Sequence, residues 1–226
     1  MSDGELGLEA PADLLAGHPA TAYLWGHVAG SGEVTDEGLE VVTNDEESAE
    51  VLAAIAGGEF ADLERETTTR EYAHDTSITR TEEEYTVSID GSDLYGQSGP
   101  LGLPVDGRGN YRFSAFSGHK RELLRGLLEG CGTVCFKSSS GTVGISFVAD
   151  DRELLEVIDE LLADCSVEAP TGDISETSSG GYWFGLEDAA APDFGEWVYG
   201  DSEETGLYAP SRRRKLRRSL EQAENV

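Results

Sequence analysis

Cysteine and histidine are the residue types in this chain that could bind a transition metal or act as a nucleophile. Cys131 and Cys135 lie four residues apart, a spacing that suits a metal site. No second pair completes such a site, because the other candidate ligands are scattered along the chain: Cys165, His18, His27, His74 and His119. Cys131 with His27 could form a nucleophile and its base, but no oxyanion-binding pattern accompanies them. The sequence therefore predicts three buried cysteines in a reducing cytoplasm, with no catalytic residue, no metal and no cofactor.

The elements that would position any site begin with two similar stretches, which start one hundred residues apart at Leu24 and Leu124. Each is apolar and contains two glycines four residues apart. These glycines are Gly26 with Gly30 and Gly126 with Gly130. Glycines at this spacing share one helix face, so two such helices can pack with their backbones in contact. One pair alone is typical of ordinary helix packing, but the repetition indicates an internal duplication. The closing glycines, Gly32 and Gly132, are expected in left-handed turns that end the helices.

The segments that follow each stretch also correspond. Residues 33–43 and 133–148 are predicted hairpins, and residues 45–56 and 150–163 have the apolar spacing of amphipathic helices. A longer hairpin is predicted at 60–89 and again at 167–186. Each half is therefore α-β-β-α-β-β, and the fold class is α+β. We assign 1–18 to a loosely held acidic arm, 19–98 to the first repeat, 99–115 to a linker, 116–200 to the second repeat and 201–226 to a basic helix.

This order of elements, with its glycine-bearing helices, resembles the single-chain LAGLIDADG homing endonucleases over about residues 22–220. The resemblance implies a monomer with two αββαββ repeats, related by a pseudo-two-fold axis along the paired helices. It also implies that the antiparallel sheets form a saddle over double-stranded DNA, with strand side chains that read the major groove. Residues 194–199 and 207–215 look like the family's closing pattern of an aromatic-bearing helix followed by a basic helix.

The resemblance also identifies the positions that would carry nuclease chemistry. In the family, an acidic residue just before the last glycine of each signature holds divalent metals, which are hard cations that prefer oxygen ligands. Here those positions are Ser31 and Cys131, and neither side chain replaces a carboxylate for magnesium. Glu129 lies two residues earlier and is expected to point elsewhere on its helix. The sequence therefore predicts that the nuclease is inactive and that the scaffold is retained for binding.

The net charge is unfavourable for DNA binding, which requires a positive surface. The chain has 45 acidic and 16 basic residues, for a formal charge of −29. Acidic residues are spread evenly and lysine is rare, a composition that resembles cytoplasmic proteins of salt-in halophiles. DNA contact would then depend on local basic groups, although cross-strand pairing with glutamates or neutralisation of the acidic body would also explain them. The candidates are Arg65, Arg70, Arg80, Lys137, Arg212, Arg213, Arg214 and Lys215.

These patterns together predict a catalytically inactive, homing-endonuclease-like DNA-binding protein that acts as a regulator in the cytoplasm of a halophilic archaeon. The alternative is a domesticated scaffold that binds a protein or small-molecule partner as an accessory factor of a metabolic operon. A basic sheet surface would favour DNA, whereas an acidic one would favour the partner. No signal peptide or membrane span is expected, because residues 1–18 are acidic and lack a long apolar run.

Overall fold

The computed structural model describes residues 10–35, 38–57, 61–72, 75–90, 100–104 and 109–225, with backbone alone at 61, 62, 67–72, 75–82, 90 and 100. The first half contains α1 (Pro19–Ser31), β1 (Gly32–Val34), β2 (Gly38–Thr43), α2 (Glu46–Ile55), β3 (Ala61–Tyr72) and β4 (Asp75–Asp90). The second half contains α3 (Lys120–Cys131), β5 (Gly132–Lys137), β6 (Thr142–Ala149), α4 (Arg152–Ala163), β7 (Ser175–Glu176) and β8 (Tyr182–Gly185). The connecting and closing elements are η2 (Pro100–Gly102), η3 (Phe113–Phe116), α5 (Ala191–Val198), α6 (Ser202–Thr205) and α7 (Pro210–Glu224).

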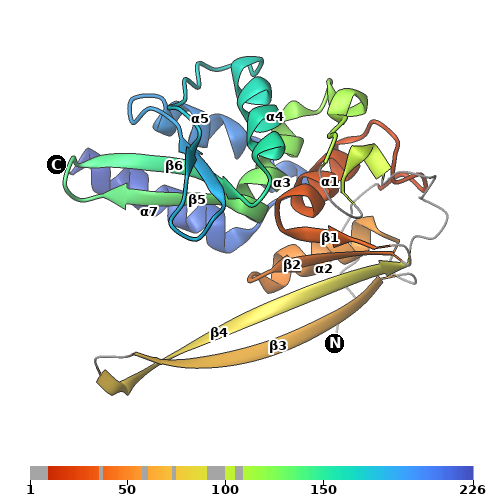
Figure 1. Cartoon of the computed structure of the whole chain (residues 1–226), viewed down its shortest axis with the longest axis horizontal. Coiled ribbons are helices and arrows are strands. Elements are labelled where there is room, and N and C mark those ends of the chain that lie inside the picture. The colour runs from red at the N-terminus through yellow and green to blue at the C-terminus, as the bar shows by residue number, and fades with distance from the viewer. Residues whose placement is uncertain are drawn as a thin grey trace.

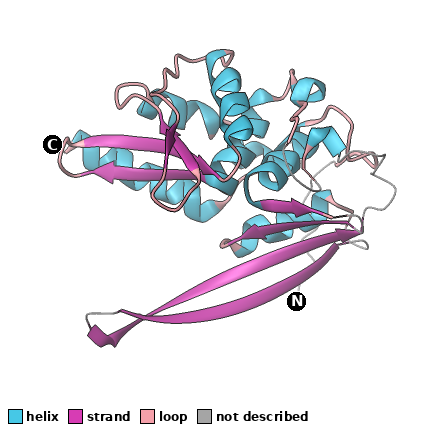
Figure 2. Ribbon diagram, viewed as in Figure 1, coloured by secondary structure: helices cyan, strands magenta, loops and turns pink. Residues whose placement is uncertain are grey.

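Both halves form the same kind of sheet, which confirms the predicted α+β fold with two α-β-β-α-β-β halves. The first sheet has the strand order β1-β2-β4-β3, and the second has the order β5-β6-β8-β7. Neighbouring strands are antiparallel in both sheets. The sheets are separate, and β3 and β4 form a long curved hairpin that extends past the rest of the first half (Figures 1 and 2).

Each sheet has one face under helices and one face open to solvent. In β2, Leu39 and Val41 are buried while Glu40 between them is exposed, as expected for side chains that alternate across a strand. In β8, Phe184 is buried and Trp183 is 43% exposed. Helix α2 packs on the buried side of the first sheet, and α4 packs on β6 and β8 of the second. We call the solvent side of each sheet its open face.

Aspartates begin the two helices that cover the sheets. The Asp45 side chain accepts a hydrogen bond from the backbone N–H of Ser48 at the start of α2, and Asp151 accepts one from Glu153 at the start of α4. Both carboxylates satisfy a backbone donor that the helix itself cannot, and their charge favours the positive end of the helix. Within the described ranges, no helix is long and apolar enough to cross a bilayer.

The late hairpin of the second half is much shorter than its counterpart in the first half. Its strands, β7 and β8, have two and four residues, with an isolated bridge between Thr171 and Leu186. The stretch 169–181 contains glycine, proline and serine in place of a run of β-branched residues, so it has few side chains that stabilise a strand. Gly180 has φ +99° in the turn, which only glycine adopts readily.

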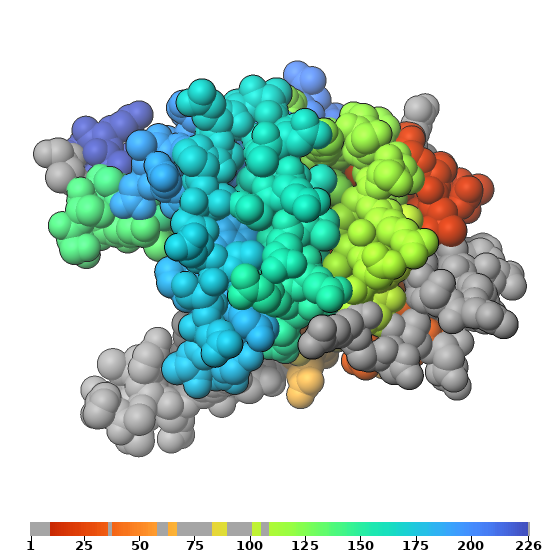
Figure 3. Space-filling view, turned by 45° about the horizontal axis from the view of Figure 1, so that its top comes forward, coloured from red at the N-terminus to blue at the C-terminus, as the bar shows by residue number. Residues whose placement is uncertain are grey.

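Segments outside the two repeats pack against the body. Leu14 and Leu15 contact the hydrophobic core, and the Trp25 indole donates a hydrogen bond of 2.7 Å to the backbone oxygen of Leu14. The C-terminal part of the expected loose arm is therefore fixed to α1. Phe113, near the end of the linker, and Phe116, where the second repeat begins, are also buried. In the space-filling view, the linker and α3 in yellow-green lie between the red N-terminal region and the cyan and blue second half (Figure 3).

Candidate functional site

Helices α1 and α3 meet along their glycine faces at the centre of the molecule. A Cβ atom added to Gly26 would lie 2.8 Å from the backbone nitrogen of Leu127, and one added to Gly126 would lie 3.0 Å from the Cα of Gly26. Further along, a Cβ on Gly30 would lie 2.9 Å from the backbone nitrogen of Cys131. These separations are shorter than ordinary carbon contacts. The four interface glycines therefore permit a backbone-to-backbone crossing that no larger residue allows.

The closing glycines serve a different purpose from the one expected. Gly32 has φ −105° and Gly132 has φ −93°, so both are extended and begin the following strand. The prediction of left-handed turns was wrong. A Cβ on Gly32 would lie 2.7 Å from the backbone oxygens of Glu40 and Val28, and one on Gly132 would lie 2.6 Å from a Leu128 methyl carbon. Close approach of neighbouring groups, and not a positive φ, requires glycine at these positions.

Ser31 and Cys131 occupy equivalent positions at the ends of the crossing helices. The Ser31 hydroxyl donates a hydrogen bond of 2.8 Å to the backbone oxygen of Val42 in β2. The Cys131 thiol lies 3.3 Å from the backbone oxygen of Leu127, and its burial raises its pKa to about 12. The serine is uncharged and the cysteine is a protonated thiol at neutral pH, so this pair does not fit a hard divalent cation. Among the described residues, no group of three potential ligands could hold a metal.

The raised pKa predicts that Cys131 is chemically inert. At pH 8 a thiol with a pKa near 12 is ionised in about one molecule in ten thousand, so alkylation should be on the order of a thousand times slower than for an ordinary thiol. The rate should rise about tenfold for each pH unit. Timed iodoacetamide labelling followed by peptide mass spectrometry measures this, with Cys135 and Cys165 as internal comparisons. Rapid labelling of Cys131 in folded protein would show an ionised thiol and would reopen a nucleophilic or metal-binding role.

Glu129 forms a buried polar network between the helices. Its carboxylate accepts hydrogen bonds from the Tyr23 hydroxyl at 2.6 Å and from the backbone N–H of Ala209 at 2.9 Å, and it lies 3.2 Å from His27 Nε2. Burial, followed by the Glu129 charge, raises the pKa of Tyr23 well above its ordinary value. Burial and Glu129 likewise raise the pKa of Tyr199. Glu129 points away from the helix ends, as expected, and joins the C-terminal segment to both halves.

Two other charged side chains hold the C-terminal segment. Arg125 is completely buried, and its guanidinium donates hydrogen bonds to the backbone oxygens of Val198 and Leu207 and to the carboxylate of Asp201. The Asp45 carboxylate that caps α2 also accepts a 2.7 Å hydrogen bond from the backbone N–H of Ser211 in the first turn of α7. One aspartate thus caps a helix of the first repeat and the closing helix. These charged groups fix α7 relative to both halves.

The hydrophobic pattern missed both buried charges. Glu129 and Arg125 alternate with leucines in α3, and charged residues in such a pattern are expected on the solvent-exposed face of an amphipathic helix. The partners of Arg125, and Ala209 as a partner of Glu129, lie 73 to 82 residues later in the chain, whereas Tyr23 and His27 lie more than 100 residues before Glu129. One signal was available in the sequence: charged residues occur within an otherwise apolar helix that must be buried on several sides. Because charges are rarely buried unless they are paired, such residues would be expected to have partners elsewhere in the chain.

The register of the first hairpin separates Arg65 from the other two arginine candidates. Arg65 pairs with Glu83, lies 5.7 Å from the centre of the Tyr85 ring, and is opposite Tyr85 in the register, which puts it on the helix-covered side. In the free protein Arg65 therefore forms the ion pair of the alternative interpretation, and its contact with nucleic acid stays a prediction. Arg70 and Arg80 are opposite one another in the register of β3 and β4, and their side chains lie outside the described residues.

The remaining basic candidates divide into paired and unpaired groups. Lys137 lies on the open face of β5, with its Nζ 2.5 Å from Asp188 Oδ1, so its charge is neutralised locally. In α7, Arg213 pairs with Glu203, and Arg212 donates a long hydrogen bond of 3.4 Å to the backbone oxygen of Glu129. Arg214 and Lys215 are exposed. The structure thus brings the unpaired candidates together on one helix.

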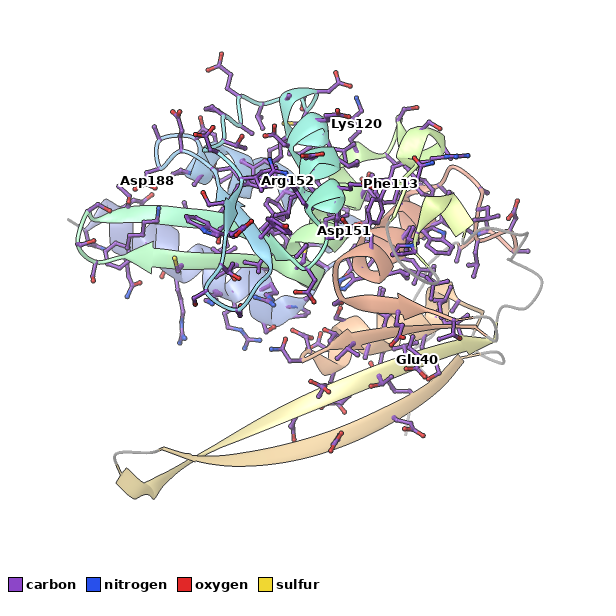
Figure 4. The ribbon with its side chains drawn as sticks, viewed as in Figure 1. Glu40, Phe113, Lys120, Asp151, Arg152 and Asp188 are labelled. Atoms are coloured by element: carbon purple, nitrogen blue, oxygen red, sulfur yellow. The ribbon has the colours of Figure 1, made fainter. Side chains whose placement is uncertain are left out.

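The two open faces differ strongly in charge. The open face of the first sheet carries exposed glutamates on all four strands, because the register aligns them across the sheet (Glu40 is labelled in Figure 4). These residues are Glu33, Glu40, Glu64, Glu66 and Glu84. The open face of the second sheet carries polar and apolar groups, including Thr133, Ser146 and the adjacent Val148 and Trp183. Phosphates would be repelled by the first face and not by the second.

A hollow of about 340 Å³ lies beside the helix ends, where the first half, the linker and the start of α4 meet. Gly30, Glu33, Tyr111 and Asp151 line it (Asp151 is labelled in Figure 4). The Tyr111 hydroxyl donates a 3.0 Å hydrogen bond to Asp151, and burial, followed by the Asp151 charge, raises the pKa of Tyr111. The polar groups on this wall therefore satisfy one another.

Comparisons with known proteins agree with this architecture. A LAGLIDADG family model, described as "Putative archaeal homing endonuclease", matches residues 1–226. The full-length DUF199/WhiA protein from Thermatoga maritima superposes with a TM-score of 0.52 at 13% identity, over 96% of this chain. The chain spans 63% of the length of that protein. The homing endonuclease I-WcaI, bound to its DNA recognition sequence, superposes with a TM-score of 0.51 at 10% identity, over 89% of this chain and 87% of that chain. Comparison with curated proteins gives no match.

Proposed function

Because the chain belongs to the LAGLIDADG homing endonuclease family, we propose that it is a DNA-binding protein that has lost nuclease activity and acts as a regulator. The observation that carries the proposal is the pair Ser31 and Cys131. At the ends of the crossing helices, one is a hydroxyl bonded to the β2 backbone and the other is a protonated thiol. Neither supplies the charge needed to hold the metals that would activate water for attack on a phosphodiester.

The close helix crossing and the duplicated sheets support retention of the binding scaffold. Two antiparallel sheets on one rigid centre are suited to docking along a duplex, where β-strands can enter the major groove. The lysine-poor acidic composition supports residence in the cytoplasm of a halophilic archaeon. In molar salt phosphate contacts weaken steeply, so binding would depend more on base contacts and DNA shape.

Selection from a random duplex library tests this function. Purified protein is incubated with the library in molar potassium chloride, with and without magnesium, and both retained and cut DNA are sequenced. We expect a motif to be enriched in the retained fraction and no fragments to accumulate with magnesium. Magnesium-dependent cutting would overturn the loss of nuclease activity, and an absence of enrichment at every salt concentration would overturn DNA binding.

A protein partner is the second candidate, and the acidic open face of the first sheet favours it. Glutamates on four adjacent strands form a surface that suits a basic protein segment better than a phosphate backbone. Under this alternative the library selection fails, whereas crosslinking in cells grown in high salt recovers a partner on peptides from β2 and β4.

A further inference from the structure

Helix α7 carries a set of exposed cations that no carboxylate of the described part of the chain binds. Its members are Arg214, Lys215, Arg217 and Arg218. No described residue makes a hydrogen bond or an ion pair with their side chains, although the Arg217 charge contributes to the lowered pKa of Glu203. Arg112 in the linker is a further exposed cation of this kind. By contrast, the cations on α3, β5 and α4 pair with carboxylates: Lys120 with Asp164, Arg121 and Arg125 with Asp201, Lys137 with Asp188, and Arg152 with Glu156.

The spacing of these four cations is unfavourable for the isolated helix. Arg214 is three and four residues before Arg217 and Arg218, so like charges are neighbours on the helix surface. Each such pair destabilises a helix by a few tenths of a kcal/mol, about as much as an opposite pair stabilises it. Of the nearby carboxylates, Glu203 is bound to Arg213, and Glu221, four residues after Arg217, makes no ion pair with a described residue. A bound polyanion would relieve the repulsion from outside.

The basic surface is held rigidly beside the second sheet. The start of α7 is fixed by Asp45 through Ser211, and the residue before it, Ala209, is fixed by Glu129. The helix then runs along β5, the edge strand of the second sheet (Figure 1). A groove of about 610 Å³ lies between the two elements, and it is lined by Lys215, Arg218 and Glu221 of α7 and by Cys135 and Phe136 of β5. The cations therefore border the β5 edge of the second sheet, whose open face carries Lys137 paired with Asp188.

The described side chains on the open face of the first sheet present the opposite sign to an approaching duplex. Its exposed glutamates repel phosphates, and Arg65 is turned to the helix-covered side and paired with Glu83. In molar salt this repulsion acts over about 3 Å, so it falls on phosphates that lie directly against the face. A duplex that covered both open faces equally would meet this repulsion along half of its contact.

We propose that the phosphates of double-stranded DNA bind to the exposed cations of α7 along the β5 edge, and that the open face of the first sheet does not contact the duplex. This inference rests on the proposed DNA-binding function and makes the contact one-sided. The resulting site is asymmetric and shorter than one that follows both sheets of the duplicated scaffold.

Charge neutralisation on the two surfaces tests the proposal. The α7 variant is Arg214→Gln, Lys215→Gln, Arg217→Gln and Arg218→Gln. The first-sheet variant is Glu40→Gln, Glu64→Gln, Glu66→Gln and Glu84→Gln, and Lys120→Gln with Arg152→Gln is the control for loss of paired cations. The dissociation constant for a duplex enriched by the wild type, or for mixed-sequence duplex fragments, is measured over a series of potassium chloride concentrations. Unfolding midpoints establish that each variant is folded.

We expect the α7 variant to bind at least about tenfold more weakly, with a salt dependence reduced by about 3.6 in the log–log slope, since each of the four lost phosphate contacts removes about 0.9. The first-sheet variant and the paired-cation control should keep the wild-type slope. An α7 variant with wild-type affinity and slope, or a first-sheet variant whose slope steepens, would overturn the one-sided contact while leaving DNA binding intact. Failure of the wild type to bind any duplex would instead overturn the proposed function, and this inference with it.

Discussion

Replacing Gly126 by alanine should destabilise the folded protein by about 3 kcal/mol, although alanine is the better helix former by about 1 kcal/mol. The added methyl group would overlap the backbone oxygen of Tyr23 and would lie 3.0 Å from the backbone nitrogen of His27. Backbone atoms of a packed helix cannot rotate away as a flexible side chain can, so α1 and α3 would have to separate. Separation would also strain the Glu129 hydrogen bond with Tyr23, which crosses the same interface.

The matched control is Gly118→Ala, because a Cβ at Gly118 has no atom within 4 Å. Thermal and denaturant unfolding in molar potassium chloride measure both variants. The Gly126 variant should unfold about 6 to 12 °C lower, since 1 kcal/mol corresponds to about 2 to 4 °C for a chain of this size. Equal midpoints for the two variants would mean that the helices are not in backbone contact at this point.

The glycine spacing and the hairpins could be predicted because they are local patterns. Residues four apart on a helix share a face whatever surrounds them, and the alternation in β2 and β4 identifies strands before their partners are known. The role of Gly32 could not be predicted in the same way. A glycine needed for positive φ and a glycine needed for close approach look identical in a sequence. Only the position of Glu40 on the neighbouring strand distinguishes them.

The candidate site was harder to predict because it depends on register and on distant segments. Arg65 is one residue from positions on the open face, and a shift of one residue reverses the face of every side chain in a strand. Its pairing with Glu83 followed from the register of β3 and β4, which local sequence does not specify. The buried charges of α3 depend on residues near 200, so no window of the sequence contains both partners.

Replacing Arg125 by methionine should destabilise the protein by about 3 to 5 kcal/mol, the largest effect we expect from removing one side chain. The loss of the guanidinium leaves the backbone oxygens of Val198 and Leu207 without their donor, and it removes a charge partner of Asp201. Unsatisfied buried acceptors are unfavourable, half-buried Asp201 keeps only Arg121 as a partner, and methionine only replaces the packing volume. Arg152→Met is the control, because the exposed pair of Arg152 with Glu156 should contribute less than about 0.5 kcal/mol.

The pH dependence of the unfolding free energy distinguishes the contribution of the Arg125–Asp201 ion pair from that of Arg125 packing. Burial alone would raise the pKa of Asp201, but the charges of Arg125 and Arg121 outweigh it and lower that pKa below its ordinary value. A depressed carboxyl pKa stabilises the fold above the unfolded value, near 3.9, and this stabilisation is lost as the pH falls through the folded value. The difference in unfolding free energy between wild type and Arg125→Met should therefore be full at pH 7 and should shrink below about pH 4. A difference that stays constant across this range would mean that the arginine acts through packing and backbone hydrogen bonds, with no contribution from the charge of Asp201.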